Sequence, residues 1–212
     1  MGELGRCRGG KIGNYFGMSE LLRDEELMER IREEDEEAFR QLIERHQDRV
    51  YGTVAKMLGG TGPDVEELAQ EIFLRVWRAA PKYEVKAKFT TWLMTITRNL
   101  VFTFFESKGK RMEEKQENPG DESAPEDWGG VSHRTASDEL SGMELAQAVE
   151  KACAELSPTQ RMVVHLRQYE GMEFEEIAQV MGMTLTGVKA LMHRARENLR
   201  DKLSGYLGAS NS

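Results

Sequence analysis

Hydrophobic positions recur at helical spacing along most of the chain. From Ala38 onward, apolar residues fall on one face of a helix, mostly three, four or seven positions apart, until a Gly-Gly-Thr-Gly-Pro run begins at Gly59. A second amphipathic segment follows and ends at Pro81, and its apolar stripe is formed by Leu68, Ile72, Phe73, Val76 and Ala80. No segment alternates apolar and polar residues over the length of a strand. The pattern therefore predicts an all-α protein.

Polar residues at the expected helix termini predict where helices begin. Asp64, with Glu67 three positions later, has the spacing of a capping box, in which two side chains satisfy free backbone N–H groups. Ser157, Pro158 and Gln160 give the same signature for a later helix, with proline at its first position.

The expected helices fall into two groups separated by an acidic stretch. A third helix is expected to begin near 89, to keep its apolar face to about 104 and to end near 108–111. Beyond it the apolar periodicity disappears, ten acidic residues face two basic ones over 112–145, and periodicity returns at Met143. We therefore expect two small helical domains with separate interiors. The predicted parts are a tail 1–23, a domain 24–111, a flexible acidic linker 112–142, a domain 143–205 and a tail 206–212.

Composition limits the class of protein. The 212 residues hold 29 Lys and Arg against 37 Asp and Glu, and a net charge of -8 opposes free diffusion to nucleic acid. Residues 72–111 nevertheless hold nine basic residues against two acidic ones, a local excess of the kind that phosphate contacts require. No apolar run approaches the ~20 residues of a membrane span. We expect a soluble, cytoplasmic protein.

Candidate catalytic and metal-binding residues are lacking in the sequence. Cys7 and Cys153 form neither a disulfide framework nor a metal knuckle, and the four histidines stand at no metal-ligand spacing. The sequence offers no nucleophile with a base and no phosphate-binding loop. We therefore predict no cofactor, no metal and no enzymatic activity.

The most specific local pattern lies in residues 174–193. Ala178 supplies a small side chain where two helices cross, Gly182 can adopt the positive φ of a turn, and Val188 closes a small core. Thr184 is placed to cap the following helix. This is the pattern of a helix-turn-helix, whose second helix enters a major groove of DNA. A helical bundle with a solvated charged face is the alternative interpretation.

Three motifs follow one another along the chain, at residues 67–77, 88–100 and 188–196. In order and spacing they resemble the extracytoplasmic-function group of bacterial RNA polymerase sigma factors. The resemblance covers about 24–111, which is similar to sigma region 2, and 143–205, which is similar to region 4. It implies a subunit that binds core RNA polymerase, at its clamp helices and flap, and directs it to promoter DNA. Whether an anti-sigma factor binds this chain stays open.

The resemblance also implies which residues make contacts. Acidic and amide side chains of region 2 bind the clamp helices, here Glu67, Gln70 and Glu71. Positions implied at the minus-10 element are Lys86, Lys88, Trp92, Arg98, Asn99, Lys108, Lys110 and Arg111, and Tyr83 or Phe89 would border a base pocket. Two roles remain open for Trp92: packing in the core, or stacking on a base. Positions implied at the minus-35 duplex are Thr186, Lys189, Ala190, His193, Arg194 and Arg196.

This chain departs from the family pattern at Thr103, Gly187 and Leu191, where Asp, Thr and Arg are usual. Two alternatives therefore remain. One is a stand-alone helix-turn-helix regulator whose first half senses a ligand or dimerises, and the other is a polymerase-binding decoy that has lost promoter reading. The sigma-factor hypothesis requires separate interiors in the two domains, and Lys189 and Arg194 open to solvent.

Overall fold

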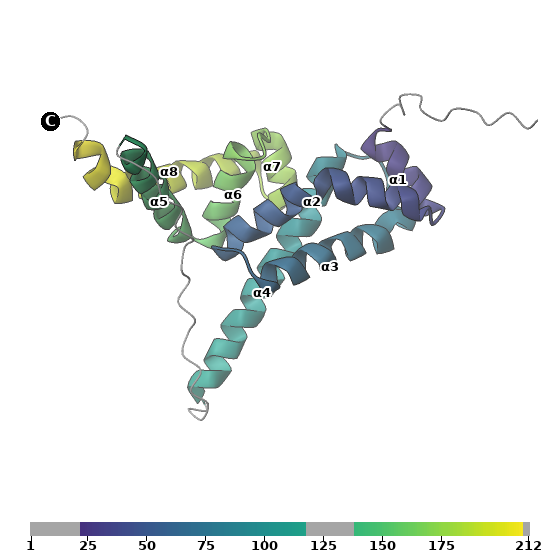
Figure 1. Cartoon of the computed structure of the whole chain (residues 1–212), viewed down its shortest axis with the longest axis horizontal. Coiled ribbons are helices and arrows are strands. Elements are labelled where there is room, and N and C mark those ends of the chain that lie inside the picture. The colour runs from purple at the N-terminus through teal and green to yellow at the C-terminus, as the bar shows by residue number, and fades with distance from the viewer. Residues whose placement is uncertain (1–21, 118–137, 210–212) are drawn as a thin grey trace, which may run out of the picture.

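The computed structural model describes residues 22–117 and 138–209, and these residues form eight α-helices and no strand (Figure 1). The prediction of an all-α fold is confirmed. The helices, with one 3-10 turn at Ala80–Lys82, are α1 Asp24–Arg32, α2 Glu36–Leu58, α3 Pro63–Ala79, α4 Phe89–Glu117, α5 Asp138–Ala154, α6 Pro158–Gln168, α7 Phe174–Met181 and α8 Leu185–Ala209.

Two of the predicted helix starts are confirmed. The Ser157 hydroxyl accepts a hydrogen bond from the Gln160 N–H, and the Gln160 side chain accepts one from the Ser157 N–H, both at 3.3 Å. In the helix-turn-helix, Gly182 has a φ of 64°, and the Thr184 hydroxyl accepts from the Gly187 N–H at 3.1 Å. Local side-chain chemistry therefore sets these termini.

The capping box predicted at Asp64 is wrong. The helix begins at Pro63, so Asp64 is already its second residue and not its cap. Proline suits this first position because it has no N–H to satisfy and its φ is already close to that of a helix. Asp64 instead pairs with Lys108 Nζ on α4, 2.9 Å from its Oδ2 atom.

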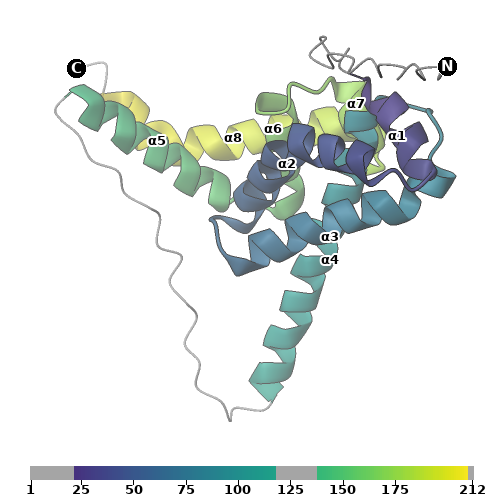
Figure 2. The same cartoon turned by 45° about the vertical axis from the view of Figure 1, so that its right-hand side comes forward.

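The limits of the predicted linker also differ from the structure. α4 continues to Glu117 and α5 begins at Asp138, whereas the sequence predicted helix ends near 111 and 143. Residues 112–117 are mostly Glu, Lys and Gln, which favour a helix even without an apolar stripe. The remainder of the predicted linker, 118–137, lies outside the described residues, as do the tail 1–21 and residues 210–212. In both views the C-terminal part of α4 projects from the other helices (Figures 1 and 2).

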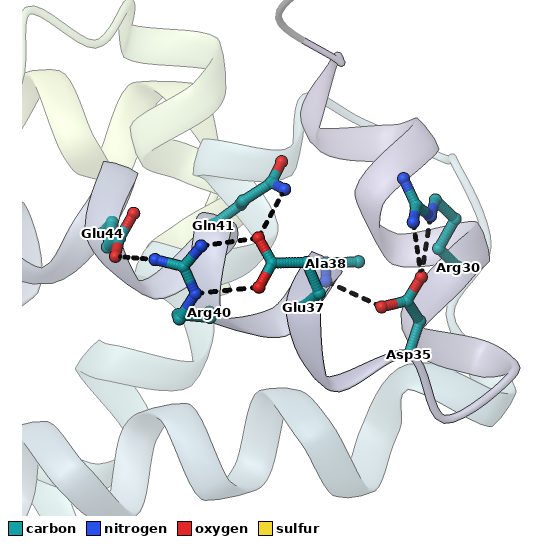
Figure 3. Close-up of polar contacts among 7 residues, drawn as sticks. All are labelled: Arg30, Asp35, Glu37, Ala38, Arg40, Gln41 and Glu44. Atoms are coloured by element: carbon teal, nitrogen blue, oxygen red, sulfur yellow. Dashed lines mark hydrogen bonds and ion pairs between the residues drawn. The ribbon is translucent and has the colours of Figure 1, made fainter. Parts of the chain in front are cut away.

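A polar corner joins α1 to the start of α2 (Figure 3). Asp35 caps α2 by accepting from the Ala38 N–H at 3.0 Å, and it also pairs with Arg30 of α1. One turn later Arg40 pairs with Glu37, and its hydrogen bond lowers the pKa of the Glu37 carboxyl to about 2. The Asp35 contacts fix the turn between the two helices, whereas the Glu37–Arg40 pair lies within α2.

Asp24 anchors α1 to α2 more deeply. Its carboxylate contacts Arg45 Nη1 at 2.5 Å and His46 Nε2 at 2.9 Å, and His46 is buried. Burial acts to raise the pKa of Asp24, but the hydrogen bonds and charges of His46 and Arg45 outweigh it and lower that pKa. The ionised form of Asp24 therefore stabilises the fold.

Replacing Asp24 with Asn is expected to lower the free energy of unfolding at neutral pH by about 1–2 kcal/mol, since hydrogen bonds to a charged group are lost. Because the folded-state pKa lies below the ordinary value of 3.8, this contribution is complete above that value. It disappears as the pH falls through the folded-state pKa. Urea unfolding of wild type and variant at neutral and acidic pH measures it, with exposed Asp48→Asn as the control. A difference that grows toward acidic pH would contradict this assignment.

The two halves of the chain pack against each other. α7 contacts α4, and α6 contacts α2. Buried side chains of both halves form one continuous hydrophobic cluster, and Arg161 Nη1 of α6 donates to the Met57 carbonyl oxygen of α2 at 2.6 Å. The expectation of separate interiors is therefore wrong. The requirement that it set for the sigma-factor hypothesis was wrong as well, because that hypothesis depends on the surface of each domain and not on the separation of their cores. Periodicity along a sequence shows that a helix has an apolar face, but not which helix covers it.

Among the described residues, no helix is both long and apolar enough to cross a membrane.

Candidate polymerase and nucleic-acid interfaces

The exposed face of α3 carries the residues implied in polymerase binding. Leu68 and Ile72 are buried on the opposite face, while Glu67 and Gln70 are exposed. Glu71 is one-third exposed and pairs with Arg75 Nε of the next turn at 3.0 Å. The amphipathic division predicted for this helix is confirmed, and its acidic and amide side chains are accessible to a partner.

An apolar residue on the same face was missed by the sequence analysis. The side chain of Leu74 is 46% exposed, and Leu74 lies three and four positions from Glu71 and Gln70, so these side chains are neighbours. Its position outside the apolar stripe of α3 was the available signal. A polar face with one exposed leucine is typical of a protein interface, because the apolar contact adds binding energy that charges alone do not.

The segment before α4 presents two exposed lysines, each beside a carboxylate. Lys86 Nζ lies 2.7 Å from Glu84 Oε2, and Lys88 Nζ lies 2.8 Å from Glu176 Oε1 of α7. Hydrogen bonds to these carboxylates raise the pKa of both lysines, which are therefore charged at neutral pH. Each lysine is therefore already paired with a carboxylate of the chain.

An open pocket of about 490 Å³ adjoins these lysines. Tyr83 and Trp92 line it, and their rings meet edge to face at a centroid distance of 4.8 Å. Trp92 is half-buried, so it both packs against Tyr83 and borders the pocket. Phe89, also expected at a base pocket, is buried behind these two rings. Because Tyr83 is buried and Trp92 is half-buried, Trp92 is the ring of this pair that is accessible for stacking with a planar group.

Two further residues implied at the minus-10 element lie on α4. Arg98 is half-buried and Asn99 is exposed, and Arg98 Nη1 donates to Asn99 Oδ1 at 2.8 Å. Arg98 Nη2 donates to the Met181 carbonyl oxygen of α7 at 3.3 Å. Both side chains therefore already have partners within the protein.

The second helix of the helix-turn-helix, α8, presents a polar face to solvent. Val188, Met192 and Ala195 are buried against α6 and α7. All the residues implied at the minus-35 duplex are exposed, within one side of the helix: Thr186, Lys189, Ala190, His193, Arg194 and Arg196. The requirement that Lys189 and Arg194 be open to solvent is met.

Both halves of the chain match sigma-70 regions. Residues 42–111 match sigma-70 region 2, and residues 146–199 match sigma-70 region 4. The chain belongs to the sigma-70 family, in its extracytoplasmic-function group. The resemblance found in the sequence is thereby confirmed, and the matches favour a promoter-directing sigma factor over a stand-alone regulator or a decoy.

Relatives of this sigma factor align along nearly their whole length. The extracytoplasmic-function sigma-E factor of Escherichia coli K12 is 29% identical over 187 residues, which cover 88% of this chain and 97% of that protein. The corresponding factor of Haemophilus influenzae is 28% identical over 193 residues, 88% and 98% of the two chains. The sigma factor RpoE of Bartonella quintana, solved in complex with the anti-sigma factor NepR, has the same fold, with a TM-score of 0.59 and 23% identity. That match covers 78% of this chain and 96% of RpoE.

The remaining basic residues implied at the minus-10 element, Lys108, Lys110 and Arg111, lie at the end of region 2. Lys108 pairs with Asp64 and lies over the Phe104 ring, with its Nζ atom 4.7 Å from the centroid. The side chains of Lys110 and Arg111 lie outside the described part of the structure. Of the three, only Lys108 can therefore be placed, on the part of α4 that crosses α3.

Gly187, the departure in region 4, lies close to the side chain that caps its helix. A Cβ atom at this position would lie 3.2 Å from Thr184 Oγ1 and 3.3 Å from the Met183 side chain. Because Thr184 caps the helix through the Gly187 N–H, a larger residue would crowd the cap.

A metal site is not indicated in the described part of the chain, where no three His, Cys, Asp or Glu side chains are grouped to hold an ion.

Proposed function

We propose that this chain binds core RNA polymerase in the cytoplasm, performs no reaction of its own, and supplies the promoter contacts for initiation. The observation that carries the proposal is the presence of matches to both sigma-70 regions in one chain. Region 2 opens the minus-10 element and region 4 reads the minus-35 duplex. An anti-sigma factor is a further expected partner, as RpoE of Bartonella quintana has one.

The α3 face is the proposed site for the polymerase clamp helices. Glu67, Gln70 and Glu71 supply acceptors, and Leu74 supplies apolar area beside them. The flap is the proposed contact of region 4. Since the chain carries a charge of -8, its own affinity for DNA is weak and strongly dependent on salt. Binding to the polymerase places both DNA-reading regions at high effective concentration on one promoter.

At the minus-10 element, an extruded base would stack in the pocket beside Tyr83 and Trp92. Stacking on an aromatic ring contributes about 1–3 kcal/mol per base, and unstacking a base costs a few kcal/mol. Since the two nearly cancel, contacts to the strand decide whether the duplex opens. Lys86, Lys88 and Arg98 supply phosphate contacts, and Asn99 supplies a contact to a base edge.

At the minus-35 element, replacing Lys189 and Arg194 with alanine is expected to weaken promoter binding by the polymerase complex. Each bidentate contact from such a side chain to guanine contributes about 1–3 kcal/mol of discrimination. The expected loss falls on the preferred promoter more than on random DNA, and a gel shift with core polymerase measures it. Arg200→Ala, which removes an exposed charge further along α8, is the control and should weaken both DNAs slightly and equally. Equal loss on the two DNAs for Lys189 and Arg194 would contradict base reading.

Run-off transcription with core polymerase on a library of promoter fragments tests the function itself. A sigma factor produces discrete transcripts, a decoy inhibits those of another sigma factor, and a stand-alone regulator leaves core polymerase inactive. We further expect the purified chain to shift promoter DNA only when core polymerase is present. A tight, specific shift by the chain alone would contradict the proposal.

A further inference from the structure

The first helix, α1, lies beside the minus-10 pocket, although it supplies none of the residues proposed to contact DNA. It precedes residues 42–111, which match sigma-70 region 2. α1 contacts the 3-10 turn Ala80–Lys82, and in both views it lies beside the end of α3 that leads into this turn (Figures 1 and 2). Lys82 and Tyr83, at the end of the turn, line the pocket. α1 is therefore next to the segment that forms one wall of the pocket.

Arg32, the last residue of α1, holds the backbone of Tyr83. Its Nη2 atom donates to the Tyr83 carbonyl oxygen at 2.5 Å, and the Tyr83 N–H donates to the Ala80 carbonyl oxygen at 3.1 Å. The hydrogen bond from Lys86 is the largest cause that lowers the pKa of the neighbouring Glu84 carboxyl, and the charge of Arg32 lowers it further. Because a charged donor makes a stronger hydrogen bond than a neutral one, the guanidinium keeps the Tyr83 carbonyl in a defined place.

The hydrogen bond of Arg32 does not serve its own helix. A basic residue in the last turn of a helix ordinarily interacts with the carbonyl groups and the partial negative charge at the end of that helix. Arg30, in the same turn, has a nearby partner in Asp35, at 2.7 Å. Arg32 is exposed and instead reaches a carbonyl group 51 positions along the chain. The buried residues of α1 are Leu27, Met28 and Ile31. Removal of the Arg32 side chain should therefore leave the packing of α1 intact.

Tyr83 connects this hydrogen bond to the accessible ring of the pocket. The Tyr83 ring is buried and meets the Trp92 ring edge to face, with the centroids 4.8 Å apart. Aromatic pairs favour this arrangement over a face-to-face one. A shift of the Tyr83 backbone would therefore change the position in which Trp92 packs best.

The start of α1 supports the same ring by a second route. Asp24 Oδ2 lies 2.9 Å from Nε2 of the buried His46, and the centroid of the His46 ring lies 5.1 Å from that of Phe89. Phe89 is also buried, and its ring centroid lies 5.6 Å from that of Trp92. Two rings therefore pack against Trp92, and each is connected to a polar residue of α1.

From these contacts we propose that α1 positions the aromatic wall of the minus-10 pocket, and that Arg32 is a positioning residue acting through Tyr83 on Trp92. The inference rests on the proposed function, because that function places an extruded base in this pocket. Stacking depends on the separation and the angle of the two planar groups. A ring that is fixed before DNA binds does not have to be ordered when the base enters, so less binding energy is lost.

The discrimination between an intact and an abasic strand tests the role of Arg32. The probes are short single strands with the minus-10 sequence of a promoter that the run-off library yields, either intact or abasic at one position. They are bound to the complex of the full chain with core polymerase, and fluorescence anisotropy gives the ratio of the two affinities. The abasic position that costs wild type most identifies the extruded base. We expect Arg32→Ala to lower the ratio at this position about fivefold, as for one hydrogen bond of typical net strength.

The matched control is Arg30→Ala, which removes the same charge from the same turn of α1 but no contact with Tyr83. It should keep the wild-type ratio. Arg32→Lys keeps a charged donor and should recover part of the ratio, because the contact with the Tyr83 carbonyl is a single hydrogen bond. A general loss of folding or of polymerase binding would weaken the intact and the abasic strand equally. An unchanged ratio in Arg32→Ala therefore overturns the proposal.

A double-variant cycle tests whether Arg32 acts through Trp92. Trp92→Leu removes the accessible ring but keeps an apolar side chain, and it should lower the ratio at least as much as Arg32→Ala. Adding Arg32→Ala to Trp92→Leu should cause no further loss, because two residues that act through the same contact are not additive. Additive losses would show that Arg32 acts on the DNA independently of Trp92, and would overturn the proposal.

Run-off transcription separates this inference from the proposed function. If wild type initiates at discrete promoters and Arg32→Ala has the wild-type ratio, the positioning role is wrong and the sigma-factor function stands. If the library yields no promoter with wild type, the proposed function fails and the positioning role fails with it.

Discussion

Reversing the charges of Glu67 and Glu71 to lysine is expected to weaken binding to core polymerase by at least about 100-fold. Both residues lie on the accessible face of α3, and like charges brought together at an interface cost several kcal/mol. Fluorescence anisotropy of labelled protein titrated with core polymerase measures the loss. Run-off transcription should fall in parallel, because promoter contacts depend on the polymerase.

The matched control is Glu29→Lys with Glu33→Lys, which makes the same change of charge at exposed positions on and just after α1. It should bind core polymerase as wild type. Since Glu71 also pairs with Arg75, the test variant loses an exposed helical ion pair, which contributes only about 0.3–0.5 kcal/mol. Its unfolding transition should therefore stay close to that of wild type. Equal polymerase binding by both double variants would place the interface elsewhere.

Truncating Ile72 to alanine should lower stability, whereas truncating Leu74 should leave stability almost unchanged, although the two residues are only two positions apart on α3. Ile72 is fully buried, so its truncation leaves a cavity and is expected to lower the free energy of unfolding by about 2–5 kcal/mol. Leu74 is 46% exposed, so its truncation should change stability by less than about 0.5 kcal/mol. Urea unfolding of the two variants measures the difference.

The same pair distinguishes a structural from a binding role. Leu74→Ala should weaken binding to core polymerase by about 1 kcal/mol or more, if its apolar area is buried against the clamp helices. Ile72→Ala should bind normally at temperatures where it stays folded. A Leu74→Ala protein with unchanged polymerase affinity would remove Leu74 from the proposed interface, even if Glu67 and Glu71 remain in it.

Local chemistry in the sequence determined much of the fold. The apolar stripe of α3, the Ser157 capping box and the turn at Gly182 depend on residues within a few positions of one another. Such interactions repeat at the period of the helix, so they can be predicted without knowing the rest of the molecule. The exposed basic face of α8 follows from the same periodicity, because Val188 and Met192 define the buried side.

Some local expectations about where helices begin and end were wrong or incomplete, each for a local reason. Pro63 begins α3 without a side-chain cap, so Asp64 is left to pair with Lys108. α1 was not predicted, since a nine-residue helix with three buried apolar residues gives a short periodic signal. Helix propensity extends α4 beyond the end of its apolar periodicity, so a search for that periodicity misses the last residues of the helix.

The sequence alone thus determined the helices, their buried faces and the family to which the chain belongs. Only the tertiary structure decided that α7 lies against α4, that Glu176 meets Lys88 and that Gln179 borders the aromatic pocket. The physical reason is that a helix's apolar and charged faces are set by nearby residues, whereas their partners are chosen among all complementary faces of the folded chain. Contacts such as Arg98 to Met181 join residues 83 positions apart, and no local spacing encodes them.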